Sequence, residues 1–116
     1  MGHAFRCAAD GIRCAVVSQR NFKIHLAVGA VALVLAVALG LDGPSVAVVV
    51  LCVALVMAAE CVNTAVEAVV DLVSPGYHEL ARRAKDCAAG AVLICAGGSL
   101  AVGLLLFAPP ILALLR

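Results

Sequence analysis

Long apolar stretches dominate this chain, and short polar stretches divide them into three runs. The helices that contain these runs are predicted over about residues 22–41, 44–74 and 77–108, and polar and apolar residues alternate over about 4–18 with the period of a helix. About 20 apolar residues make roughly 30 Å of helix, which matches the hydrocarbon thickness of a bilayer. The pattern therefore predicts an all-α integral membrane protein with three transmembrane helices and one additional N-terminal helix, all in a single domain over 1–116.

The N-terminal helix is predicted to lie along the membrane surface. Its apolar residues, such as Phe5 and Ile12, share one face, and its charged residues share another, namely Arg6, Asp10 and Arg13. A basic amphipathic helix of this kind lies in the interface between lipid and water.

Turn residues set the ends of the predicted spans. The turn Asp42–Gly43–Pro44 follows the first span, and Pro44 suits the first position of the next helix. Pro75–Gly76 ends the second helix, and Pro109–Pro110 marks the far end of the third. The second helix would be about 45 Å long against a core of about 30 Å, so we expect its last turns to reach into the cytosol.

Composition supports a membrane protein. Of the 116 residues, 66% are hydrophobic and 13% are charged, and the mean hydropathy is +1.19. A soluble domain carries about 25% charged residues, so the surplus apolar surface must face lipid. A net charge of +1 argues against a nucleic-acid partner, which needs a basic face. The six cysteines lack the spacing of a zinc site, and we expect them to pack as small hydrophobic residues.

The basic residues orient the predicted spans. Four of the eight Lys and Arg residues lie before the first span or within its first two residues, and three lie together in the second polar stretch. Basic residues concentrate on the cytoplasmic side of membrane proteins. We therefore expect the N-terminus and residues 72–86 in the cytoplasm, and the Asp42 turn outside.

A row of polar residues on the second predicted span is the first sign of chemistry. Glu60, Asn63, Glu67 and Asp71 recur at intervals that place them within an arc of about 80°. Glu60 falls about 24 Å from Pro44, near the inner edge of the bilayer, where an ionised carboxylate is costly unless it is paired or hydrated. A solvated helix face explains Glu67 and Asp71 but not Glu60. The row therefore predicts a functional site.

A second polar group follows the Pro75–Gly76 break. If residues 77–86 are helical, His78, Arg82 and Lys85 share a face within about 60°. Carboxylates that hold Mg²⁺, with an amide and a lysine nearby, suit the positioning of a nucleotide phosphate during transfer, and an interfacial carboxylate can act as general base toward a lipid hydroxyl. The chain has neither a P-loop nor the protein-kinase signatures.

These residues also carry a resemblance. The runs are ECVNTAVEAVVD at 60–71, YHEL at 77–80 and AKD at 84–86, with GIR at 11–13 and RNFKIH at 20–25. These runs resemble the prokaryotic diacylglycerol kinase family, which includes the undecaprenol kinases, and the resemblance extends over nearly the whole chain. The resemblance implies a multi-pass enzyme of the bacterial cytoplasmic (inner) membrane that phosphorylates a lipid hydroxyl with ATP. It also implies a homotrimer whose active sites are shared between subunits.

The resemblance further implies roles for individual residues. Glu60 would be the general base that takes the proton of the lipid hydroxyl, and Glu67 would bind the Mg²⁺ that bridges the ATP phosphates. The remaining positions at the nucleotide would be Asn63 and Lys85 beside the phosphates, with Asp71, Tyr77, His78 and Asp86 around them. Gln19 stands where the family usually has a second metal-binding Glu, and its amide oxygen would ligate Mg²⁺ without supplying charge.

The acceptor and two rival functions stay open at this point. The run at 20–26 is more similar to the undecaprenol kinase branch, and the run at 74–80 is closer to the diacylglycerol branch. We expect undecaprenol, which gives undecaprenyl phosphate, with diacylglycerol and phosphatidic acid as the alternative. A small membrane transporter would use Glu60 for proton coupling, although such a carboxylate is expected nearer the midplane. An inactive membrane subunit that keeps the fold is supported by Gln19 alone.

Overall fold

Four α-helices make up the computed structural model, which describes residues 1–116. The helices are α1 (Gly2–Ser18), α2 (Arg20–Ala38), α3 (Gly43–Val73) and α4 (Glu79–Leu114). No strand is present, so the all-α prediction is confirmed. The helices α2, α3 and α4 are each long and apolar enough to cross a membrane, which confirms the three predicted spans.

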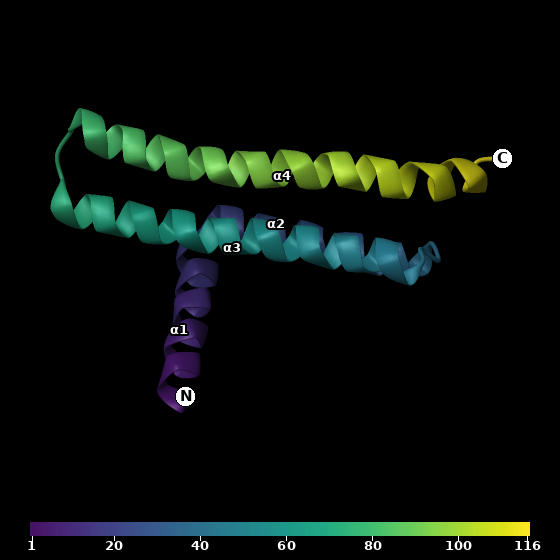
Figure 1. Cartoon of the computed structure of the whole chain (residues 1–116), viewed down its shortest axis with the longest axis horizontal. Coiled ribbons are helices and arrows are strands. Elements are labelled where there is room, and N and C mark those ends of the chain that lie inside the picture. Colours follow the sequence, from purple (N-terminus) through teal and green to yellow (C-terminus); the bar gives the residue numbers. More distant parts are fainter.

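The three long helices form a bundle from which α1 departs. Figure 1 shows α3 and α4 side by side in opposite directions, with α1 running crosswise to them. The central helix is α3, because both α2 and α4 pack against it. The crosswise direction of α1 is the one that an amphipathic helix takes when it lies in the interface beside spanning helices.

The helices α2 and α3 approach each other closely at Gly29. A Cβ atom added at Gly29 would lie 2.8 Å from Cγ1 of Val53, which is too short for a real contact. Small residues allow such close approach between membrane helices. The buried residues of the two helices are Phe22, Gly29 and Ala36 on α2 and Val49, Val56 and Glu60 on α3. Glu60 therefore belongs to the face of α3 that packs within the bundle.

The turn between α2 and α3 forms where the sequence predicts it. Gly40 adopts a left-handed conformation with φ of 72°, which closes the end of α2. Asp42 then caps α3, because its Oδ1 accepts a hydrogen bond of 2.9 Å from the backbone N–H of Ser45. Hydrogen bonding from Ser45 also lowers the pKa of Asp42.

The far end of the third span differs from the prediction. The helix α4 continues through Pro109 and Pro110 to Leu114, whereas the proline pair was expected to end it near 108. Each proline removes a backbone N–H, so the carbonyls of Leu105 and Leu106 lose their usual donors. The fixed φ of proline is nevertheless helical, and membrane helices tolerate such interruptions. The proline pair therefore does not stop the helix here.

Most of the apolar surface of the single chain is exposed. The helix α4 has no buried residue, and Leu93, Ile94 and Leu105 expose about three quarters of their surface. In a membrane such a surface faces lipid tails or another helix.

Candidate active site at one end of the bundle

Glu60 lies buried between α2 and α3. Only 4% of its surface is exposed, and its Oε1 lies 3.2 Å from Nε2 of His25 on α2. The backbone carbonyl of Glu60 also accepts a hydrogen bond of 2.9 Å from the Thr64 hydroxyl. A carboxylate within a membrane helix needs a polar partner, and His25 provides it. The sequence pattern does not predict this contact, because it joins two different helices.

Asn63 and Glu67 continue the polar row on α3. The Asn63 side-chain amide donates a hydrogen bond of 3.3 Å to Oε1 of Glu67. The other end of the same amide, Oδ1, is buried and has no hydrogen-bond partner. Buried polar atoms are usually paired, so this acceptor is suited to a ligand that the chain itself does not supply.

These oxygen atoms fit a magnesium ion that is held largely by phosphate. Mg²⁺ usually takes one or two protein carboxylates and completes its shell with substrate phosphates and water. The Glu67 carboxylate and the unpaired Asn63 Oδ1 supply oxygen atoms that can act as metal ligands of this kind. No group of three or more His, Cys, Asp or Glu side chains in the chain is arranged to hold a metal.

The predicted site residue Gln19 lies at the junction between α1 and α2. Its backbone is extended, and its side chain makes no capping hydrogen bond to α2.

An ion pair joins the two polar groups of the sequence. Nζ of Lys85 on α4 lies 2.5 Å from Oδ1 of Asp71 on α3. The pair spans the Pro75–Gly76 break, and both side chains remain partly exposed. The carboxylate row and the basic cluster, predicted as separate features, therefore meet at the same end of the bundle.

Arg82 organises the first turns of α4. It donates hydrogen bonds to Oε1 of Glu79 at 2.8 Å and to Oδ2 of Asp86 at 3.1 Å. The Tyr77 hydroxyl donates to the other oxygen of Glu79 at 2.8 Å. Hydrogen bonding from Arg82, followed by that from Tyr77, lowers the pKa of Glu79. Sequence reasoning placed Tyr77 and Asp86 beside the nucleotide but did not show that Arg82 and Glu79 connect them.

His78 caps the helix rather than sharing its face. Its Nδ1 accepts a hydrogen bond of 3.1 Å from the backbone N–H of Leu80. Because α4 begins at Glu79, His78 lies just outside the helix that was expected to align it with Arg82 and Lys85.

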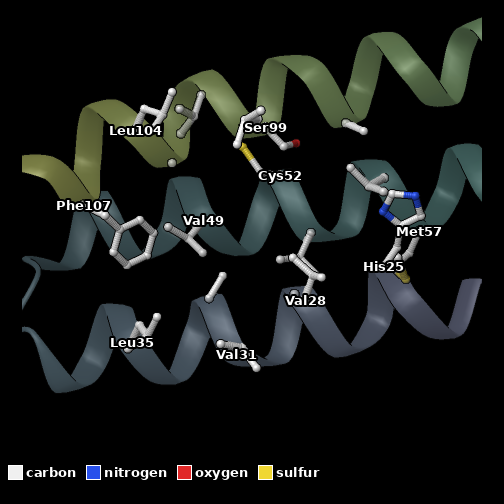
Figure 2. Close-up of a pocket in the computed structure, with 18 of the residues that line it drawn as sticks. His25, Val28, Val31, Leu35, Val49, Cys52, Met57, Ser99, Leu104 and Phe107 are labelled. Carbon is white, nitrogen blue, oxygen red and sulfur yellow. The ribbon is translucent and has the colours of Figure 1, made fainter. Parts of the chain in front are cut away.

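An apolar cavity reaches His25, the residue that contacts the Glu60 carboxylate. It has a volume of about 530 Å³ and lies among α2, α3 and α4, and 15 of its 19 lining residues are hydrophobic. Figure 2 shows His25 and Met57 at one end of the cavity and Leu35 and Phe107 at the other. The polar site and an apolar space within the bundle therefore meet at His25.

Three helices long enough to span a membrane, a crosswise amphipathic helix and a carboxylate-rich cluster at one end of the bundle define a small helical membrane protein. Residues 6–107 match the family described as prokaryotic diacylglycerol kinase. The chain belongs to this family, and the predicted resemblance is confirmed. Together with the apolar helices, this membership makes it a bacterial membrane protein.

Three relatives show how the similarity is distributed. The chain is 49% identical over 113 residues to a diacylglycerol kinase of Synechocystis sp., an alignment that covers 97% of this chain and 65% of the relative. It is 36% identical over 106 residues to the undecaprenol kinase of Bacillus subtilis, covering 91% of this chain and 86% of the relative. It is 39% identical over 84 residues to the diacylglycerol kinase of Escherichia coli, covering 72% of this chain and 69% of the relative. The chain thus spans about two thirds of the length of the Synechocystis relative.

Proposed function

We propose that this protein transfers the γ-phosphate of ATP to the hydroxyl of a membrane lipid, with Glu60 as the general base. The observation that carries the proposal is the burial of Glu60 between two spanning helices, where it contacts His25, a residue that lines an apolar cavity. Such a carboxylate can meet a hydroxyl that is presented by a lipid at the edge of the bilayer. The family membership and the names of its relatives supply the reaction class.

The proposed reaction is a direct transfer. The lipid oxygen forms a bond to the γ-phosphorus while the bond from that phosphorus to the oxygen bridging toward the β-phosphate breaks, and ADP leaves. Glu60 accepts the proton that the lipid hydroxyl loses. In this scheme Glu60 acts as a proton acceptor and not as a nucleophile, so the phosphoryl group passes directly to the lipid oxygen.

The polar residues beyond Glu60 would hold the nucleotide. Glu67 and Asn63 would hold Mg²⁺, which when bound neutralises phosphate charge during transfer. Lys85 would contact the transferring phosphoryl group, and its present partner Asp71 would keep it at the site between turnovers. The residues proposed to surround the nucleotide are Asp71, Tyr77, His78 and Asp86, with Gln19 as a neutral ligand near the phosphates.

Two acceptors follow from different observations. The run at 20–26 favours undecaprenol, as the sequence predicts. The identity of 49% to a relative named diacylglycerol kinase favours diacylglycerol, against 36% for the relative named undecaprenol kinase. Both lipids present a hydroxyl at the interface, so the same arrangement of Glu60 and Lys85 serves either one.

The assembly proposed for this function is a homotrimer in the bacterial inner membrane, with the N-terminus and residues 72–86 in the cytoplasm. The exposed apolar face of α4 supports association with other copies. One chain supplies few side chains that could bind a metal ion at this site. This favours an active site that is completed by a neighbouring subunit.

Phosphate transfer from labelled ATP tests the proposal. Purified protein in mixed micelles with Mg²⁺ is offered undecaprenol and diacylglycerol in separate reactions, and the labelled lipid is measured. We expect label in at least one lipid, and the preferred lipid identifies the acceptor. Folded protein that labels neither lipid, but carries protons across liposome membranes, would support the transporter instead.

A further inference from the structure

We infer that His25 is a positioning residue for Glu60, holding one carboxylate oxygen so that the other faces the acceptor hydroxyl. The inference rests on the proposed role of Glu60 as general base. The inference gives a residue of α2 a role in the reaction, in addition to the polar residues on α3.

The contact between the two side chains is specific. His25 Nε2 lies 3.2 Å from Oε1 of Glu60, and no other side chain pairs with that carboxylate. With its N–H on Nε2, the imidazole donates to Oε1 and leaves Oε2 available. The Glu60 side chain is only 5% exposed, so water does little to hold it in place. A single fixed donor therefore decides where the free oxygen points.

Helix packing holds His25 in reach of Glu60. Gly29 lies one turn beyond His25 on α2, and its contact partner Val53 lies two turns before Glu60 on α3. The close approach at Gly29 and Val53 therefore fixes the separation of the helices near the pair. A long flexible side chain is not needed to bridge them, and a short planar imidazole suffices.

His25 also connects the carboxylate with the apolar cavity. It lines one end of the cavity, as Figure 2 shows, and 30% of its side chain is exposed. The free oxygen of Glu60 would consequently be oriented at the place where a polar lipid head meets the apolar part of the bundle.

Two substitutions separate donation of the hydrogen bond from simple space filling. His25→Leu fills space but cannot donate, whereas His25→Gln keeps an N–H donor on a side chain of similar reach. We expect His25→Leu to lower kcat by about 10- to 100-fold, as small misplacements of catalytic groups do, with the KM for ATP nearly unchanged. His25→Gln should restore most of kcat. Thermal unfolding of each variant, and His3→Leu on the surface helix, serve as controls.

A double-mutant cycle tests whether His25 acts through Glu60. In a Glu60→Asp background the carboxylate is withdrawn from the imidazole, so His25→Leu should then cost much less than it does in the wild type. An equal loss in both backgrounds would overturn the inference, as would unchanged kcat in His25→Leu or equal losses in His25→Leu and His25→Gln. These results are distinct from failure of the proposed function, in which the wild-type protein itself transfers no phosphate.

Discussion

Glu60 is a carboxylate at a position where a helix that only spans the membrane would carry none. Its location near the end of an apolar run was enough to predict a functional role, because the cost of the charge depends on depth along one helix. Its partner His25 could not be predicted in the same way. Periodicity gives the face of a helix but not which residue of another helix meets that face.

Lys85 provides a test at the residue scale. Removing its ammonium group by Lys85→Ala should lower kcat by about 100-fold or more, because the charge that develops on the transferring phosphoryl group loses a donor. The matched control is Arg83→Ala, which removes a neighbouring positive charge that forms no ion pair in the chain. Steady-state phosphate transfer compares the two variants. Similar losses in both would indicate that general positive charge, rather than a contact from Lys85, is what the reaction needs.

At the scale of elements, the helix pattern predicted the spans well and their ends less well. The turn at Asp42 formed as expected, because a capping aspartate and a glycine act through local geometry. The prediction that the proline pair at 109–110 ends α4 was wrong, because proline removes hydrogen bonds but its φ is compatible with a helix. The start of α4 also depends on a local detail, the His78 cap, which moved His78 off the expected face.

Packing between α2 and α3 can be tested at Gly29. The substitution Gly29→Ala places a Cβ 2.8 Å from Cγ1 of Val53 and should destabilise the fold by about 1–3 kcal/mol. Adding Val53→Ala removes the two Cγ atoms and should recover most of that loss. Thermal unfolding in detergent measures both effects. In contrast, Gly11→Ala on α1 meets no atom within 4 Å and should not destabilise. Failure of the second substitution to rescue the first would contradict the proposed contact.

The first turns of α4 should respond to pH through Glu79. Its pKa is lowered from the ordinary value of 4.5, so the stabilisation is present above that value and is lost as the pH falls through the folded pKa. Amide hydrogen exchange at the start of α4 should therefore be slower in the wild type than in Glu79→Gln near neutral pH. The difference should shrink as the pH falls below 4.5 and through the lower pKa that Glu79 has in the folded protein. A difference that stays constant with pH would contradict the role of the ionised carboxylate.

At the scale of the whole molecule, the sequence pattern predicts the helices but not the contacts between them. Three spans and a surface helix follow from apolar runs that must be buried in lipid, and the resemblance carried by residues 60–71 and 77–86 identified the family. The contact of Asp71 with Lys85 depends on how α3 and α4 pack, which the sequence pattern does not determine. The sequence pattern likewise does not determine which of the two lipids is the acceptor, because both present a hydroxyl at the interface.

Oligomeric state is the prediction that belongs to the whole molecule. Because α4 buries no residue and exposes large apolar side chains, we expect three copies to associate in the membrane. Native mass spectrometry in detergent should show a particle of three times the 11.7 kDa chain, and phosphate transfer should fall when that particle dissociates. A fully active monomer would contradict the shared sites.

The central claim, that Glu60 removes the proton of the acceptor hydroxyl, is tested most directly by comparing turnover and ATP binding in Glu60→Gln. This change keeps the volume of the side chain but removes its ability to accept the proton. The account predicts that phosphate transfer falls by about 100- to 10,000-fold while the Kd for ATP with Mg²⁺ is nearly unchanged. If ATP binding weakens in parallel with turnover, or if turnover persists, Glu60 is not the general base.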